Sequence, residues 1–243
     1  PRSQPIALQN IGGLYSVAND DARAEEYFHQ AAVLFTDDPV LSLSLHNSRG
    51  NVLAKLGRDA EAGKEYETAI VIARGMNKPL LEARLLSNLA RSQVALKRYD
   101  DANRTITRGF ELIRGADADV LRRHLLATAA ALASERGNIG EALRFIHGTF
   151  DGMDLAKTTV EFRSDHFYAY QIFNKAENTR EALKHLRAMK RLDDESTKVA
   201  ATAGAALMAA KFDWAKQQNQ ILLLQTQEAE RRVRYQQTLF LLI

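Results

Sequence analysis

GGLYSVANDDARAEEYFHQA at residues 12–31 and GNVLAKLGRDAEAGKEYETA at residues 50–69 are the two stretches that decide the fold. In each stretch, small and large apolar residues recur at steps of three or four, in two series. Steps of this size form an apolar stripe along one face of a helix. The two series are nine residues apart, which is too far for one face, so a turn lies between them. Each stretch is therefore predicted to form a helical hairpin.

The pattern returns along the chain at a nearly fixed interval. The same place in successive units is held by Ala24, Ala62, Ala102, Ala142 and Ala182, at intervals of 38 or 40 residues. A fixed period in this range is typical of solenoids, in which stacked units share a continuous core. Inside the units, the segments NDD, LGRD, KRYDD, RGNIG and ENTR supply the residues that end one helix and cap the next. We predict an all-α solenoid of about five helical hairpins over residues 1–192.

These units resemble the tetratricopeptide repeat (TPR). The small–Tyr–Ala–Phe–Ala series of the first unit carries the family's signature, and the second unit matches it nearly as well. The resemblance covers residues 6 to about 191, with units three to five keeping the register through more degenerate residues. TPR units have a period of roughly 34 residues, whereas the units here have 38 to 40. The additional residues are expected to lengthen the helices or the loops between hairpins.

Residues 193–243 differ from the repeats, because they contain one glycine, no proline and no turn signal after Gly204. They are predicted to form one long C-terminal helix of about 50 residues, roughly 70 Å in length. Positions spaced seven apart give this helix a weak and partly polar heptad seam. The seam candidates are Phe212, Ala215, Asn219, Leu222, Thr226, Ala229, Val233, Gln236 and Phe240. The alternatives are a parallel dimeric coiled coil, a single solvated helix and an antiparallel pairing.

The composition excludes several kinds of chemistry. The chain has no cysteine, which excludes disulfides, catalytic thiols and thiolate zinc sites. The formal charge is +3 and basic residues are interspersed with acidic ones, so no nucleic-acid partner is expected. The six histidines form no metal-binding pair of the HExxH kind, and His46 and His166 stand where packed interhelical residues belong. We expect no catalytic residue, no metal site and no cofactor.

The resemblance to TPR proteins implies that a concave face, lined by the first helix of each hairpin, binds the ligand. A peptide or protein is the expected partner, with a small molecule as the alternative. Asparagine amides suit a peptide backbone, and Lys or Arg suits a carboxylate. Carried onto this sequence, the candidates are Asn47, Asn51, Lys55, Ser87, Arg91, Phe167, Gln171, Asn174 and Lys175, bordered by Arg84 and His124. The alternative interpretation of these residues is that they are solvated helix positions.

The C-terminal part resembles the junction in bacterial membrane receptors. Such receptors have a TPR sensor, a linking helix, a transmembrane helix and then a diguanylate cyclase (GGDEF) or histidine kinase domain. The resemblance rests on KFDWAKQQNQILLLQTQEAERR at residues 211–232 and on the apolar run LFLLI at residues 239–243. It implies a membrane next to the C-terminus and a sensor on the periplasmic side. Arg231, Arg232 and Arg234 instead favour the cytoplasmic side, where basic residues are enriched.

Three hypotheses of function result. The first is a non-catalytic sensor domain of a transmembrane signalling protein, in which binding on the concave face passes through the C-terminal helix to an output domain outside this chain. In this hypothesis the C-terminal helix also joins two chains as a homodimer. The second hypothesis is a soluble TPR adaptor or co-chaperone scaffold. The third is a cytoplasmic TPR regulator.

Overall fold

A computed structural model describes residues 3–34 and 38–240, without the side chains of residues 3, 215, 219, 230 and 232–240. Within this part of the chain the structure has ten α-helices, one 3₁₀ turn and no strand. The helices are α1 (Ser3–Val17), α2 (Asp21–Leu34), α3 (Pro39–Lys55), α4 (Asp59–Gly75), α5 (Pro79–Ala95), α6 (Tyr99–Leu112), α7 (Asp119–Glu135), α8 (Ile139–Phe150), η1 (Val160–Phe162), α9 (Arg163–Lys175) and α10 (Thr179–Phe240). The chain divides into two compact units, Pro1–Ala200 and Ala201–Ile243.

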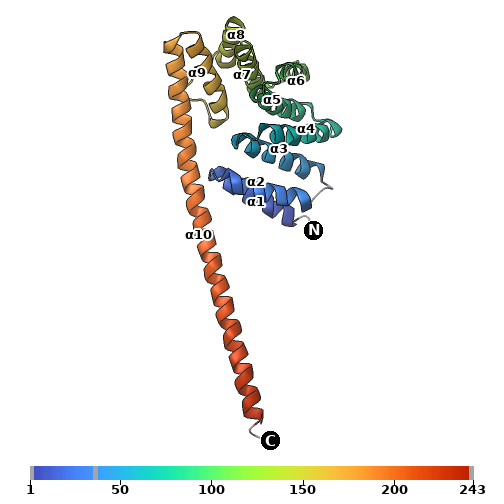
Figure 1. Cartoon of the computed structure of the whole chain (residues 1–243), viewed down its shortest axis with the longest axis vertical. Coiled ribbons are helices and arrows are strands. Elements are labelled where there is room, and N and C mark those ends of the chain that lie inside the picture. Colours follow the sequence, from blue (N-terminus) through green and yellow to red (C-terminus); the bar gives the residue numbers. More distant parts are fainter. Residues whose placement is uncertain (1–2, 35–37, 241–243) are drawn as a thin grey trace. The chain divides into compact units, whose positions relative to one another are not determined.

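The first unit is a stack of helical hairpins, which confirms the predicted all-α, TPR-like solenoid. Helices α1 and α2, α3 and α4, α5 and α6, and α7 and α8 pair as neighbours, and each pair lies against the next (Figure 1). The fifth hairpin is made by α9 and the first turns of α10. The five periodic alanines are almost fully buried, because each lies where the two helices of its hairpin come closest.

Small residues on the first helix of a hairpin allow the second helix to approach closely. A Cβ atom added to Gly50 would lie 2.6 Å from Cε1 of Tyr66, a distance that real Cβ contacts do not reach. Gly12 has the same relation to Phe28, at 2.9 Å. The small–aromatic pairs that define the sequence pattern are therefore interhelical contacts. They give the hairpin its close packing, as side chains in protein interiors interlock with few voids.

The five hairpin turns share one backbone geometry. In the first turn the N–H of Asp20 donates to the carbonyl of Tyr15 at 2.9 Å, and the other four turns contain the same six-residue bond. The residue before the donor has a positive φ in each turn, as in the Schellman motif that ends many helices. This residue is glycine at Gly57 and Gly137, and non-glycine at Asn19, Lys97 and Glu177. The Gly or Asn residue that the sequence predicts for these turns is thus present in three of them. In the other two, Lys97 and Glu177 adopt the positive φ.

The long C-terminal helix begins earlier than predicted. Helix α10 starts at Thr179 and includes the second helix of the fifth hairpin, whereas we predicted a separate helix from residue 193. Asp193 and Asp194 do not interrupt it, because their carboxylates pair with Arg163 at 2.8 Å and Lys190 at 2.6 Å. Buried residues of α10 end at Ala200. The division into domains at residues 192 and 193 stays a prediction.

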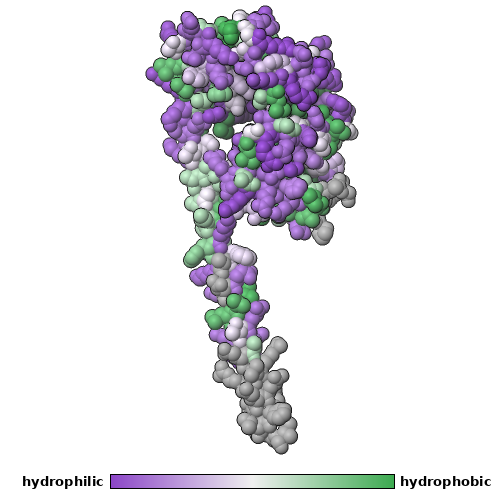
Figure 2. Space-filling model, viewed as in Figure 1, coloured by the Kyte–Doolittle hydropathy of each residue, from purple (hydrophilic) through white to green (hydrophobic). Residues whose placement is uncertain are grey.

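Beyond Ala200, the helix belongs to the second unit and its described side chains are exposed or half-exposed. Hydrophobic and hydrophilic residues mix along this part of α10 in the view of Figure 2. In the described ranges, no helix combines the length and the apolar character that crossing a membrane requires. The heptad positions Ala215, Asn219, Val233, Gln236 and Phe240 lie outside the described side chains, as do Arg232 and Arg234. The end of the LFLLI run, residues 241–243, lies outside the described residues.

Candidate ligand-binding face

The first helices of the second to fifth hairpins, α3, α5, α7 and α9, contribute one set of side chains that hydrogen bonds and a shared pocket connect; Val94 and Ala131 in it are buried and the others are at least partly exposed. We call this set the first-helix face, and it consists of Asn47, Asn51, Asn88, Arg91, Val94, Ala131, Phe167 and Gln171. Helices that stack in one direction place equivalent positions of successive repeats side by side. Five of the predicted candidates therefore share one surface: Asn47, Asn51, Arg91, Phe167 and Gln171.

One half of the face is an amide network between α3 and α5. The Nδ2 group of Asn88 donates to the Oδ1 atoms of Asn47 and Asn51, at 3.3 Å each. Asn51 also accepts a hydrogen bond from the hydroxyl of Tyr66 at 2.9 Å. Arg91 donates to Oδ1 of Asn88 at 2.5 Å. These bonds occupy the carbonyl oxygens of all three amides. In the described part of the chain, the Nδ2 groups of Asn47 and Asn51 have no acceptor.

The other half of the face is a pocket of about 290 Å³ between α5, α7 and α9. Apolar side chains, including Val94, Phe167 and Tyr168, form much of its lining. Arg91 borders it on one side and Gln171 on another. A mostly apolar recess with a few placed polar groups is the usual form of a ligand pocket. Arg91 belongs to both halves, so the amide network and the pocket form one site.

Burial favours the protonated, neutral form of the two tyrosines near Arg91. Burial raises the pKa of Tyr66 and Tyr168 above the ordinary value for tyrosine. Both side chains therefore remain neutral hydrogen-bond donors at neutral pH, because a buried environment disfavours the phenolate. Arg91 opposes this effect in both cases but is the smaller influence. The face and its pocket thus contain the cations Arg91 and Lys97 and the carboxylate of Glu135, next to neutral amides and phenols.

His124 binds within the solenoid instead of lying free at the border of the face. Its Nδ1 atom lies 2.5 Å from Oδ2 of Asp165, and its ring lies 4.9 Å from that of Phe162. Asp165 is fully buried, and burial raises the pKa of its carboxyl while the His124 contact lowers it. The pair joins α7 to α9 across the interface of two hairpins. His124 is therefore a packing residue whose side chain is occupied.

Ser87 is buried, so the prediction that it lies on the binding face is corrected by the structure. Its hydroxyl has no hydrogen-bond partner among the described residues. Successive helix positions are rotated by about 100°, so a small error in helix phase moves a residue from the surface into an interface. Asn88, the next residue, occupies the surface position. Arg84 and Asn174 are exposed on α5 and α9.

Two predicted lysines are held by the neighbouring hairpin. Lys55 contacts Asp21 and Ser16 at 3.3 Å each, and Lys175 contacts Glu135 at 3.1 Å and Ser134 at 3.2 Å. Both lie at the end of a first helix and reach the preceding repeat. Their side chains are still about half exposed. They border the ends of the face and join adjacent repeats by pairs that contribute little stability in such exposed places.

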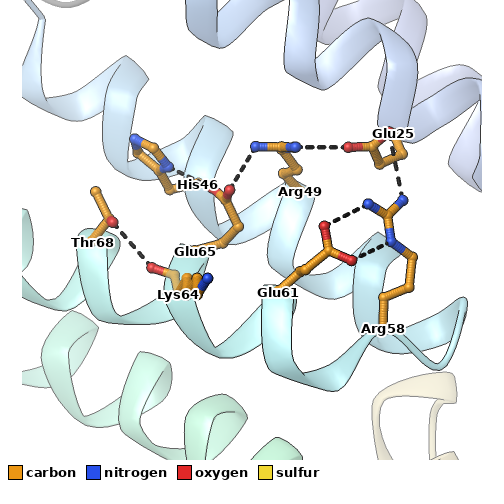
Figure 3. Close-up of polar contacts among 8 residues, drawn as sticks. All are labelled: Glu25, His46, Arg49, Arg58, Glu61, Lys64, Glu65 and Thr68. Carbon is orange, nitrogen blue, oxygen red and sulfur yellow. Dashed lines mark hydrogen bonds and ion pairs between the residues drawn. The ribbon is translucent and has the colours of Figure 1, made fainter.

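A network of charged residues joins the first two hairpins near the amide network (Figure 3). Arg49 donates to Glu25 of α2 at 2.9 Å and to Glu65 of α4 at 2.6 Å. His46 contacts the other oxygen of Glu65 at 2.7 Å, in agreement with its predicted place in an interhelical contact. Arg58 binds Glu61 and approaches Glu25 at 3.9 Å. The network fixes the position of α3, and therefore of Asn47 and Asn51.

Sequence reasoning missed Asn88 and Tyr168, because the 40-residue interval from Asn47 points to Ser87, one residue before Asn88. Asn88 stands 41 residues after its partner Asn47, and His124 with Asp165 and Ser134 with Lys175 have the same separation. These contacts join positions one residue beyond the 40-residue period, so each side chain meets the residue that follows its equivalent in the next repeat. In the described residues, no three His, Asp or Glu side chains gather in a way that could hold a metal ion.

Comparison with known proteins bears on the fold. No protein-family model matches the chain, and no curated protein matches it. Solved structures do match. BtubC (BKLC) from P. vanneervenii has a TM-score of 0.55 and 16% identity, over 77% of this chain and 79% of that one. The nearly identical TPR-like repeats of a Podosopora anserina kinesin light chain give 0.56 and 12%, over 81% and 98%.

The apo form of RapI gives a TM-score of 0.59 and 13% identity, over 81% of this chain and 65% of RapI. The fold is that of a TPR-like solenoid. Identities of this size show a shared architecture, and the ligand of each protein depends on its own surface residues. The function of this chain has to be inferred from the first-helix face itself.

Proposed function

We propose that this chain is a non-catalytic interaction module that binds an extended peptide segment of a partner protein on the first-helix face. The observation that carries the proposal is the amide network of Asn47, Asn51 and Asn88, which continues through Arg91 into an apolar pocket. The network spans the second and third repeats, and the pocket spans the third, fourth and fifth. A long, narrow ligand suits such a site better than a compact one.

The chemistry of the face matches the groups of a peptide. Asparagine side chains resemble the backbone amide and can both donate and accept hydrogen bonds with it. The Nδ2 groups of Asn47 and Asn51 would donate to peptide carbonyls. Arg91 would bind a carboxylate, as guanidinium groups do in bidentate fashion. The pocket volume of about 290 Å³ suits one apolar side chain of the peptide beside Phe167.

The proposal is tested by selecting binders from a random peptide display library with the full chain, followed by calorimetry of the strongest peptide. Asn88→Ala and Arg91→Ala should each weaken binding by about tenfold, the effect of losing one central polar contact. Asn103→Ala is the matched control, because Asn103 is exposed on α6, a second helix. A library without any saturable binder, or peptides that bind equally to all variants, would contradict the proposal.

We further propose that binding is communicated through α10, as in the sensor regions that the C-terminal part resembles. The support is the exposed apolar side chains of α10, including Met208, Phe212 and Leu222, which stand at heptad spacing. In this role the chain would form a homodimer through α10 at the periplasmic side of a membrane, with a diguanylate cyclase or histidine kinase as the output. The proposal of a soluble or cytoplasmic adaptor uses the same first-helix face and is equally consistent with the fold.

A further inference from the structure

A second cavity, of about 540 Å³, lies within the first unit where four segments of the chain meet. Its lining comes from the first hairpin turn and the end of α3, from residues 157–160 before α9, and from residues 191–199 of α10. None of its lining residues also lines the pocket on the first-helix face. We call it the hairpin–α10 cavity. Its volume is within the range of cavities that hold small ligands, about 300–1,000 Å³.

One part of the cavity lining is apolar. Val17 of α1, Val160 of η1 and Val199 of α10 all border it, and all three are exposed. Single exposed valines are common on protein surfaces. Three of them from separate elements around one cavity form a local apolar surface that is open to an aliphatic group. Burying this surface under a ligand would be favourable by the hydrophobic effect.

The other part of the lining is basic. Lys55, Lys157 and Arg191 border the cavity, with Glu195 as the one carboxylate in the lining. Lys55 and Lys157 are paired with Asp21 and Asp154 at 3.3 Å; both lysines and Asp154 are about half exposed or more, whereas Asp21 is 18% exposed. Ion pairs of this kind contribute about 0–1 kcal/mol. A ligand anion can therefore replace the carboxylate partners at small expense.

Arg191 is fixed at the inner side of this basic region. Its Nη2 group donates to the carbonyl of Thr158 at 2.7 Å, and its Nη1 group donates to Glu195 at 2.8 Å. The Nε atom is buried and has no acceptor in the described part of the chain. A buried donor without an acceptor is unfavourable, and a bound oxyanion or water would satisfy it. Arg191 thus offers a preorganised cation beside two exposed lysines.

We propose that the hairpin–α10 cavity binds a small amphiphilic anion, with a carboxylate or phosphate head group and a short aliphatic tail. The head group binds Lys55, Lys157 and Arg191, and the tail covers the three valines. Such a ligand contacts the first hairpin and the last one at the same time. This site is independent of the proposed peptide function, because it uses different residues and a different class of ligand.

The test uses the full chain with hexanoate and hexyl phosphate as probes, and isothermal calorimetry as the readout. Saturable binding of either anion supports the proposal, and the comparison of the two identifies the preferred head group. Hexanol and hexylamine keep the tail without the anion, and inorganic phosphate keeps the anion without the tail. These three should bind at least about tenfold more weakly. Absence of saturable binding by both anions, or equal binding of hexylamine, would overturn the proposal.

Matched variants locate the site. Lys157→Glu should weaken the binding of the anion by up to about fivefold, since an exposed ion pair contributes up to about 1 kcal/mol. Lys190→Glu should leave it unchanged, since Lys190 is also a paired surface lysine, with 73% exposure against 84% for Lys157. Val160→Ser should weaken it, and Val71→Ser, on α4, should not; these valines are 58% and 67% exposed. Binding that is insensitive to both cavity variants would place the anion elsewhere and overturn the assignment.

Discussion

At the scale of single residues, close contacts between small and aromatic side chains hold each hairpin together. Gly50 is the clearest case, because a Cβ atom there would meet the ring of Tyr66 at three atoms within 3.0 Å. Tyr66 has little freedom to move, since it is buried and its hydroxyl is bound to Asn51. The same contact that packs the hairpin therefore also positions an amide of the candidate binding face.

Gly50→Ala is expected to destabilise the protein, and Gly13→Ala to stabilise it. Both glycines are inside helices, where alanine is favoured by up to ~1 kcal/mol. At Gly13 nothing lies within 4 Å of the new methyl group, so this gain remains. At Gly50 the clash with Tyr66 costs about 1–3 kcal/mol, which exceeds the gain. Denaturant unfolding midpoints measure both effects. Equal midpoints for the two variants would show that the contact at Gly50 relaxes freely.

At the scale of elements, the repeat period predicted more of the helical architecture than any individual residue did. The steps of three and four residues predicted which side chains of a hairpin meet. The turn segments predicted where its two helices join. The sequence did not predict the phase of α5 finely enough to separate Ser87 from Asn88. It also did not show that α10 starts at Thr179. No helix-breaking residue separates the part of α10 that packs in the fifth hairpin from the part beyond it, so the sequence carries no local signal for that change. Partners of buried polar groups, such as His124 for Asp165, depend on the packing of two repeats.

The fifth hairpin contains a buried pair of histidines. Nδ1 of His166 lies 2.8 Å from Nδ1 of His185, and Nε2 of His166 contacts the hydroxyl of Thr158 at 2.9 Å. Phe150 packs against both rings. One proton can lie between the two Nδ1 atoms, so at least one ring must be neutral to accept it, and the contact excludes protonation of both rings. Burial lowers the pKa of His166 to about 3 and that of His185 to about 4.

The free energy of unfolding is expected to fall as the pH falls from about 6.5 to 4. The unfolded chain binds protons on both histidines near pH 6.5, whereas the folded chain binds them only near pH 3 to 4. The unfolded state then holds more protons, and acid favours it, by up to roughly 1.4 kcal/mol per pH unit for each histidine. Asp165 has the opposite sign, because its pKa is raised by burial, and it offsets part of the loss.

Urea unfolding between pH 4.5 and 7.5 measures this dependence. His185→Gln removes one of the two groups and should reduce the slope of stability against pH by about half. His29→Gln is the control, since His29 is exposed on α2 and should leave the slope unchanged. If His185→Gln has the slope of the parent protein, the acid sensitivity comes from other groups.

At the scale of the whole molecule, the two compact units differ in what stabilises them. In the first unit, every hairpin buries its apolar stripe against its neighbours, as a solenoid requires. In the second unit, α10 has no neighbouring helix within the chain that covers its described apolar residues. An isolated helix in water gains little from propensity alone and depends on packing. The apolar positions of α10 thus call for a second surface, which the proposed homodimer supplies.

We expect the chain to dimerise through the seam of α10, and Leu222 provides the test. Leu222 is on the seam and is 63% exposed in the single chain, whereas Leu224 is 61% exposed and lies off the seam. Leu222→Asp should convert the dimer to a monomer in sedimentation equilibrium, because it buries two carboxylates against each other. Leu224→Asp should remain dimeric. Deleting residues 212–243 should also give a monomer, with the hairpin stack still folded since its burial ends at Ala200. A parent chain that stays monomeric at all concentrations, or a dimer that survives both Leu222→Asp and the deletion, would exclude α10 as the dimer interface and favour the adaptor interpretation.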